Sequence, residues 1–599
     1  MLQDFTLSAR PENGPPRLAT LRGQMAQAGL DGWLQPRADA HQGEYVAACD
    51  DRLAWLTGFT GSAGGAYVTR DRAAVASDGR YRLQARDQCA PEIEVLIEPG
   101  DKPADWLRAA LPQGGRLGFD PWLHTPAQIA GLEKALAGSG IELVAHDNLV
   151  DRIWADRPAA PAAPARLHPG QWAGEAAADK RARMAAALKR DGQRAVVLTL
   201  PDSIAWLTNL RGADIPRNPV MQAFAILTDE AQLTIFTEPS KLAGLDLDAA
   251  TRIRPQAALA PALRMLTGPV RLDPATAPLA VRQELDDAGV SVSEGADPVI
   301  LAKAVKNRAE IAGMQAAHHR DALAMVRFLA WLDAAISAGQ PLTEIAVVRQ
   351  LEAFRADTGE LIDLSFETIC GSGPHGAIVH YRVTEDSDRA IRPGDVLLID
   401  SGAQYADGTT DITRTLPVGD AGDPAFDAVR GPYTRVLQGM IAISRLRFPT
   451  GLAGRDIDAV ARAPLWMAGQ DYDHGTGHGV GAALSVHEGP ARISRMSDVA
   501  LQAGMILSNE PGYYRAGAFG IRIENLIVVA EAEAEPGRAM LGFDTLTLVP
   551  IDTRLIDRSL MARAEIDWLN AYHARVRDAL SPHLTGDDLR WLTQATEAL

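Results

Sequence analysis

Two segments of this chain, 151 residues apart, nearly repeat each other. Residues 51–57 read DRLAWLT and residues 202–208 read DSIAWLT, so that Trp55 corresponds to Trp206. Each copy is followed by a glycine-bearing loop and then by an apolar run typical of a strand, GGAYVT in the first copy and QAFAILT in the second. A short match alone can occur by chance, but the shared downstream pattern predicts a duplicated α/β unit.

Two further features divide the chain. Residues 157–169, RPAAPAAPARLHP, hold four prolines among alanines, which is typical of an extended spacer. Beyond Lys306, the run EIAGMQAAHHRDALAMVRFLAWLDAAI has apolar residues at three- and four-residue spacing and no proline, which predicts a long amphipathic helix. We therefore expect a first α/β domain over 1–160, its repeat over 161–305, and a third domain over 306–599.

Composition excludes several classes of function. The 599 residues carry a formal net charge of −17, which argues against nucleic-acid binding and against anchoring on anionic lipid, since both need a basic surface. No apolar window is long enough to span a membrane, and the start of the chain lacks a secretory signal pattern. Cys49, Cys89 and Cys370 form no CxxC pair, which argues against a thiolate zinc site or a disulfide framework. We expect a cytoplasmic protein.

Two aspartates flank a predicted hairpin. PGDVLLID reads as a turn followed by a buried strand that ends at Asp400, and TTDITRTL alternates as a second strand that carries Asp411. The 11-residue spacing brings the two carboxylates onto adjacent strands, where they repel each other unless a cation or a proton lies between them. Each aspartate alone is equally explained as a turn or cap residue.

Histidines gather in a glycine-rich run further along the chain. DHGTGHGVG places His474 and His478 four residues apart, and His487 follows in SVHEGP. The glycines allow the backbone to approach a ligand closely. A phosphate-binding loop is excluded, because no GK[ST] ends the run and no GxGxxG opens a helix.

Two more carboxylates complete the candidate site. Glu510 ends the apolar run in SNEPGYY, and Glu524 lies in GIRIENLIVV, where Ile521 and Ile523 alternate with Arg522 and Glu524. If the isoleucines face the core, Arg522 and Glu524 face a cleft or solvent. The candidate ligands are Asp400, Asp411, His478, Glu510 and Glu524.

Four carboxylates and one imidazole make an oxygen-rich ligand set. Such a set suits Mn²⁺ or another divalent first-row ion. Two such ions about 3.5–4 Å apart could share bridging carboxylates and a bridging hydroxide. Four negative charges would then neutralise two dications.

These motifs resemble those of a known family. LIDSGAQYADGTTDITRT, HGTGHGVG with VHEGP, SNEPGYY and GIRIEN are similar to the metal-site motifs of the pita-bread metallopeptidases, in the family order Asp, Asp, His, Glu, Glu. DAHQGEYVAACDDRLAWLTGFTGSAG, SDGRYRLQA, IAWLTNLRG, KAVKN, DLSFETI and LTLVPID extend the resemblance to the three-domain cytosolic aminopeptidase P (Xaa-Pro aminopeptidase) family along nearly the whole chain. The resemblance implies two related N-terminal α/β domains, a C-terminal pita-bread catalytic domain, two divalent metal ions, most commonly Mn²⁺, and a homodimer.

It also implies an activity and a role for each ligand. Peptides with proline in the second position would be cut between the N-terminal residue and that proline by a metal-bridged hydroxide. Asp400 would bind one metal and His478 the other, while Asp411 and Glu524 bridge them. Glu510 would complete the second metal's shell and act as a general base.

The resemblance implies residues for substrate as well. His380, in GAIVHYRVTE, would lie beside the scissile bond, while His474 and His487 would bind substrate and stabilise the oxyanion. Arg80, in SDGRY, would contact the peptide. The implied catalytic residues are His380, His474, His487 and Glu510, and the implied substrate-binding residues are Arg80, His380, His474, His487, Tyr514 and Arg522.

Two alternatives remain open at this point. A prolidase-like dipeptidase could use the same scaffold, although the long N-terminal half argues against it. A non-catalytic binding protein could also use it, although the complete ligand set argues against that.

Overall fold

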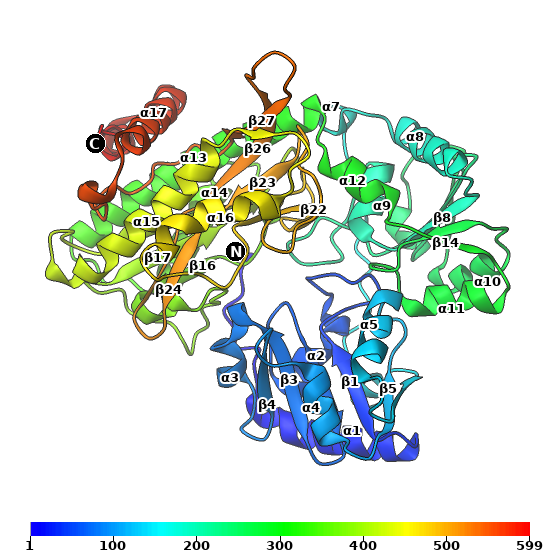
Figure 1. Cartoon of the computed structure of the whole chain (residues 1–599). Coiled ribbons are helices and arrows are strands. Elements are labelled where there is room, and N and C mark those ends of the chain that lie inside the picture. Colours follow the sequence, from blue (N-terminus) through cyan, green and yellow to red (C-terminus); the bar gives the residue numbers. More distant parts are fainter. Residues whose placement is uncertain (1) are drawn as a thin grey trace. The chain divides into compact units, whose positions relative to one another are not determined.

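Two six-stranded sheets carry the N-terminal half of the chain. The computed structural model describes residues 2–599, and Figure 1 labels its elements. The first sheet contains β1 (Gly32–Pro36), β2 (Gly65–Thr69), β3 (Ala73–Asp78), β4 (Glu94–Glu98), β5 (Gly115–Phe119) and β6 (Ile141–Ala145). The second contains β8 (Ala195–Leu198), β10 (Phe224–Thr228), β11 (Leu233–Phe236), β12 (Thr251–Arg254), β13 (Val270–Leu272) and β14 (Val292–Glu294).

The two sheets have the same topology. Their strand orders are β4-β3-β2-β1-β5-β6 and β12-β11-β10-β8-β13-β14. In the first sheet the pairs β1-β2 and β2-β3 are antiparallel, and in the second sheet so are the corresponding pairs β8-β10 and β10-β11. The three remaining pairings of each sheet are parallel. Matching order and direction at every position confirm the predicted duplication.

Helices pack on both sheets. Those of the first are α1 (Gly14–Gln27), α2 (Arg52–Thr57), α4 (Pro103–Ala110), α5 (Pro126–Leu136) and α6 (Leu149–Ile153), and those of the second are α8 (Ala177–Arg190), α9 (Pro201–Thr208), α10 (Leu259–Arg264) and α11 (Leu279–Asp287). The repeated sequence segments form α2 and α9. Both helices end at a left-handed residue, Gly58 with φ 89° and Asn209 with φ 52°, a conformation that glycine and asparagine tolerate best.

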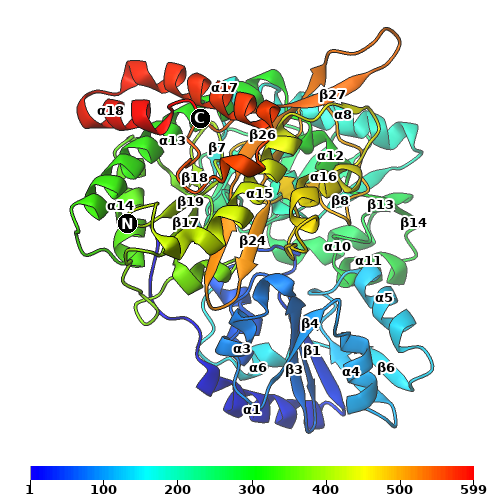
Figure 2. The ribbon, with the colours of Figure 1, turned by 60° about the vertical axis from the view of Figure 1, so that its left-hand side comes forward.

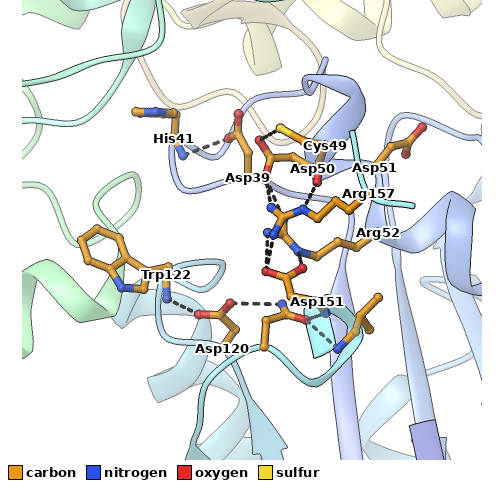
Figure 3. A network of polar contacts seen from close by, with 12 residues as sticks. Asp39, His41, Cys49, Asp50, Asp51, Arg52, Asp120, Trp122, Asp151 and Arg157 are labelled. Carbon is orange, nitrogen blue, oxygen red and sulfur yellow. Dashed lines mark hydrogen bonds and ion pairs between the residues drawn. The ribbon is translucent and has the colours of Figure 1, made fainter. Parts of the chain in front are cut away.

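The proline-rich segment begins in an ion-pair network (Figure 3). The guanidinium of Arg52 binds both carboxylate oxygens of Asp151, at 2.6 and 3.0 Å, and reaches Asp50 at 2.9 Å. Arg157 binds the same Asp151 at 2.7 Å and donates to the backbone oxygen of Cys49. The predicted spacer lacks regular structure over 158–165, but these contacts fix its start.

The chain divides into two compact units, residues 8–300 and residues 2–7 with 301–599. The second, which we call the C-terminal unit, contains α13 (Arg308–Ser337), α14 (Glu344–Ala356), α15 (Asp427–Ser444), α16 (Gly454–Trp466), α17 (Arg563–Leu580) and α18 (Gly586–Ala595). The predicted long helix is confirmed as α13, whose start is capped by Asn307 and Glu310. Helices α17 and α18 lie beside α13 (Figure 2).

Antiparallel strands form the core of the C-terminal unit. One sheet has the order β16 (Ile369–Ser372), β17 (Val396–Ser401) and β19 (Ile412–Pro417), and a hairpin joins β24 (Gly512–Arg515) to β25 (Phe519–Arg522). A larger sheet has the order β20 (Phe448–Pro449), β27 (Met540–Thr545), β26 (Asn525–Ala532), β23 (Ile506–Asn509), β21 (Gly477–Gly479) and β22 (Glu488–Ile493). Apolar side chains of α13, α14 and α15 pack against the three-stranded sheet and β25. In the described part of the chain, no helix is both long and apolar enough to cross a membrane.

Candidate active site

The two predicted aspartate ligands lie at facing ends of paired strands. Asp400 lies in β17, where the register pairs it with Thr413 of β19. Asp411 immediately precedes β19, so it does not lie on the second strand as the sequence pattern predicts, but its side chain is buried beside the strand end. The hairpin therefore brings both carboxylates to one end of the sheet.

His478 presents one ring nitrogen to two carboxylates. Its Nδ1 lies 2.9 Å from the carbonyl oxygen of Gly479 and donates to it, since a carbonyl only accepts. Its Nε2 lies 3.5 Å from both Asp411 Oδ2 and Glu510 Oε1. A ring whose Nδ1 is held by a backbone carbonyl and whose Nε2 faces anions is oriented as metal-binding histidines are.

The two glutamates lie in short segments that connect consecutive strands. Glu510 lies between β23 and β24, and Glu524 lies between β25 and β26. Ligand atoms of Asp411, His478 and Glu524 all lie within 4.8 Å of one another. Glu524 is buried rather than exposed to solvent, and it accepts a 2.7 Å hydrogen bond from Thr413 Oγ1.

Burial leaves these carboxylates in need of a cation or a proton. Burial raises the pKa of Asp400, and it raises the pKa of Glu510 to about 7 despite the nearby His478. Burial and then the charges of Asp411 and Glu510 raise the pKa of Glu524 well above its ordinary value. Among the described residues, the buried Oδ1 of Asp400 has no hydrogen-bond partner. Three buried carboxylates and the largely buried Glu510, with one oxygen of Asp400 unpartnered among the described residues, fit divalent cations.

The pKa of His478 is also raised, but in this residue burial opposes the shift. Burial disfavours its imidazolium, but the carboxylates of Asp411 and Glu510 outweigh burial and raise the pKa of His478 to about 9. In the absence of metal, a proton on this ring would partly replace the missing cation.

A chain of hydrogen bonds leads away from Asp400. Arg522 donates to Asp400 Oδ2 at 2.5 Å and to the Tyr514 hydroxyl at 2.6 Å. That hydroxyl lies 2.9 Å from Nε2 of His474, whose Nδ1 lies 2.7 Å from the carbonyl oxygen of Gly475. Three of the predicted substrate-binding residues are therefore joined to a predicted ligand.

The remaining predicted histidines also lie near the ligands. The ring of His487 packs edge-on against that of His478, with centroids 4.3 Å apart. His380 is half-buried, and Arg522 Nη2 reaches the carbonyl oxygen of the preceding residue, Val379, at 3.4 Å.

Arg80 belongs to the other unit of the chain. There its guanidinium binds both oxygens of Asp78, at 2.9 and 2.7 Å. This pair does not test the predicted contact with peptide.

Two polar residues in the site escape the sequence analysis. Thr413 donates to Glu524 and accepts from Arg522 Nε at 3.2 Å. Ser508 accepts from the backbone N–H of His478 at 2.9 Å, and its own hydroxyl lies 3.2 Å from Glu510 Oε1. Each lies two residues from a ligand, and strand alternation, which puts such residues on one face, was the signal available for them.

Family models cover most of the chain. Residues 312–531 match metallopeptidase family M24, and residues 539–599 match the C-terminal region of that peptidase family. Residues 17–153 and 156–310 each match a creatinase/prolidase N-terminal domain.

Whole-length relatives give the same assignment. The chain is 40% identical to "Aminopeptidase P2" of Arabidopsis thaliana over 95% of its own length and 86% of that protein. It is 40% identical to "Probable Xaa-Pro aminopeptidase P" of Neurospora crassa over 98% of its length and 89% of that protein. A crystal structure of the X-prolyl aminopeptidase of Caenorhabditis elegans, described as a cytosolic enzyme with a di-nuclear active site, matches with a TM-score of 0.92 and 34% identity, covering 98% of this chain and 100% of that one.

Proposed function

Because the chain belongs to metallopeptidase family M24, among its Xaa-Pro aminopeptidase P members, we propose that it removes the N-terminal residue from peptides whose second residue is proline. The fold is that of the family, with two related α/β domains followed by a pita-bread catalytic domain. The observation that carries the proposal is the convergence of Asp411, His478 and Glu524, with Asp400 and Glu510 beside them.

The ligand roles are those that the family resemblance implies. Asp400 would help to hold one metal ion and His478 the other, while Asp411 and Glu524 would contribute to both. Two bound cations would supply an activated water and polarise the peptide carbonyl. Glu510 would complete the shell of the second metal and act as the general base that takes a proton from that water.

The surrounding imidazoles would take part in the proposed chemistry, and Arg522 would help to bind the substrate. His380, His474 and His487 would bind the substrate and donate to the developing oxyanion. The leaving nitrogen of proline belongs to a tertiary amide without an N–H, so a proton has to reach it, and Glu510 could return the one it accepted. Arg80 and Tyr514 would help to hold the peptide.

Metal identity, assembly and location belong to the same proposal. Mn²⁺ suits the oxygen-rich ligand set, and a cytosolic location agrees with the description of the Caenorhabditis elegans relative. A homodimer is supported by three exposed apolar side chains of the C-terminal unit, Trp466, Met467 and Met496, because the contact of Arg495 with the Trp466 ring brings the two pairs of sequence neighbours together.

Metal analysis and a peptide-length series on one preparation test the proposal. With two equivalents of Mn²⁺ bound, Xaa-Pro-Yaa peptides are expected to release their first residue, and Xaa-Pro dipeptides to react more slowly. A preference for dipeptides would instead identify a prolidase-like enzyme. Stoichiometric metal without any cleavage would overturn the peptidase proposal.

A further inference from the structure

A buried carboxylate outside the metal site accepts hydrogen bonds from several residues of the loop that carries His380. Glu344 is the first residue of α14, and its side chain is fully buried, 0% exposed. Its Oε1 accepts from the backbone N–H of Ser372 at 2.7 Å. Its Oε2 accepts from the Tyr381 hydroxyl at 2.9 Å and from the backbone N–H of Arg389 at 3.3 Å.

A ring nitrogen adds to this set. Nδ1 of His375 lies 3.0 and 2.9 Å from the two oxygens of Glu344, and the His375 ring packs on Tyr381 with centroids 4.5 Å apart. All four donors come from residues 372–389, the loop that contains His380. One carboxylate therefore satisfies groups from the start, the middle and the end of that loop, and such charge-assisted hydrogen bonds are the strong kind.

The other side of the loop meets the metal site. The backbone of Gly376 packs so closely on Gly520 of β25 that a Cβ at 520 would lie 1.7 Å from the Gly376 oxygen. Two residues further along, Arg522 donates to the carbonyl oxygen of Val379 and to Asp400. The loop is thus held between Glu344 on one side and the strand bearing Arg522 on the other.

We propose that Glu344 is a positioning residue, which sets the place of His380 beside the scissile bond by holding loop 372–389 through Ser372, His375, Tyr381 and Arg389. In the described part of the chain, the hydrogen-bond partners of Glu344 include no ligand carboxylate. Tyr381 directly follows His380 in the chain, so its hydrogen bond to Glu344 fixes the backbone next to the imidazole. This assignment rests on the proposed function through the role given to His380.

A matched pair of variants separates positioning from general destabilisation. Glu344→Gln keeps the side-chain volume but replaces one of the two accepting oxygens by an N–H₂ group, which then faces two or three of the four donors. Glu352→Gln makes the same change at a buried glutamate on the same helix, where the carboxylate accepts from the backbone of Gln3 instead. We expect Glu344→Gln to lower kcat/KM about 10- to 30-fold, and Glu352→Gln less than 3-fold, with two metal ions bound in both. Tyr381→Phe, which deletes one donor, is expected to lower it about 3-fold.

A double-mutant cycle with His380→Ala tests the route of the effect. Glu344→Gln is expected to change kcat/KM less than 2-fold when His380 is already absent, since its effect passes through that ring. An equal loss in both backgrounds, or equal losses from the two glutamine variants, would overturn the inference. Absence of cleavage by the wild-type protein would instead overturn the proposed function.

Hydrogen exchange gives a readout that does not need activity. Amides of residues 372–389 are expected to exchange at least tenfold faster in Glu344→Gln or Tyr381→Phe than in the wild-type protein or Glu352→Gln. Unchanged exchange in both loop variants would overturn the inference even if His380→Ala has no measurable activity.

Discussion

The four carboxylates of the candidate metal site would be unfavourable at this degree of burial if no cation or proton balanced their negative charge. Asp400, Asp411 and Glu524 are buried, and Glu510 is largely so. The protein keeps this arrangement because a proton or a cation can occupy it, and the two compete for the same oxygens.

That competition predicts how the stability of the metal-free protein depends on pH. The pKa of Glu510 is raised to about 7, so the folded state binds an extra proton between about pH 4.5 and 7, and its stabilisation is lost as pH rises through 7. The pKa of His478 is raised to about 9, so the stabilisation from its protonated ring is likewise lost as pH rises toward 9. We expect the chelated protein to lose on the order of 2 kcal/mol of unfolding free energy between pH 5.5 and 8.

Thermal unfolding with and without Mn²⁺ at the two pH values checks this. The gain in Tm from Mn²⁺ should be larger at pH 8, because the cation replaces the missing protons. Glu510→Gln, which cannot titrate, should flatten the metal-free trend. An increase in Tm from Mn²⁺ that is larger at pH 5.5 than at pH 8 would contradict the proposed competition between protons and the cation.

Asp400→Asn tests the unpartnered oxygen of the first predicted ligand. The amide keeps the shape of the side chain but removes its charge, so we expect one metal equivalent to be lost and kcat/KM to fall about a thousandfold or more. Metal analysis by mass spectrometry and peptide kinetics measure both. Asp423→Asn, at an exposed cap on the same unit, serves as the control, and two metals bound to both variants would exclude Asp400 as a ligand.

At the scale of elements, close backbone packing positions the strand that carries Arg522. Replacing Gly520 with alanine would place a Cβ 1.7 Å from the oxygen of Gly376. We expect Gly520→Ala to cost about 2–3 kcal/mol of unfolding free energy and to reduce activity, since β25 has to move. Gly131→Ala, in α5 with nothing within 4 Å, should instead stabilise by up to about 1 kcal/mol. Urea unfolding distinguishes them, and equal stabilities would contradict the packing argument.

The ion-pair network of the first α/β domain is absent from its repeat. The position of Arg52 is taken by Ser203 in the second copy. Arg52→Met would leave Asp50 and Asp151 with Arg157 as their remaining partner in the network, and we expect it to cost about 1–2 kcal/mol in the N-terminal unit. Arg72→Met, which removes a half-exposed pair with Glu94, should cost less than about 0.5 kcal/mol. Losses of equal size in urea unfolding would mean that the network adds nothing.

The sequence pattern predicted those features whose signals come from residues close together in the chain. The repeat, the helix after Lys306 and the five candidate ligands all stand out because their signals lie within short windows. Glu344 did not, because its donors are contributed by residues 28 to 45 positions later, and the partners of Arg52 include Asp151, 99 residues away. The pattern also placed Asp411 on a strand that begins one residue later, since strand ends depend on pairing as well as on alternation.

At the scale of the whole molecule, the exposed apolar side chains of the C-terminal unit predict self-association. Met467 is 92% exposed and Met496 is 86% exposed, and the Arg495 guanidinium lies over the ring of the partly exposed Trp466. We expect a dimer by light scattering after gel filtration, and a monomer for the double variant Met467→Asp, Met496→Asp. Met265→Asp, at another exposed methionine in the N-terminal unit, should leave the dimer intact. A wild-type monomer would remove this part of the proposal.

Two cations, held by five side chains and acting on an Xaa-Pro bond, are the centre of the proposed function. The most direct test is to add Mn²⁺ stepwise to metal-free protein and follow release of the first residue from an Xaa-Pro-Yaa peptide. We predict that the rate rises until two equivalents are bound per chain and then stays constant, with the N-terminal residue and the Pro-Yaa fragment as the only products. Two bound equivalents without release, or cleavage at a different bond, would contradict it.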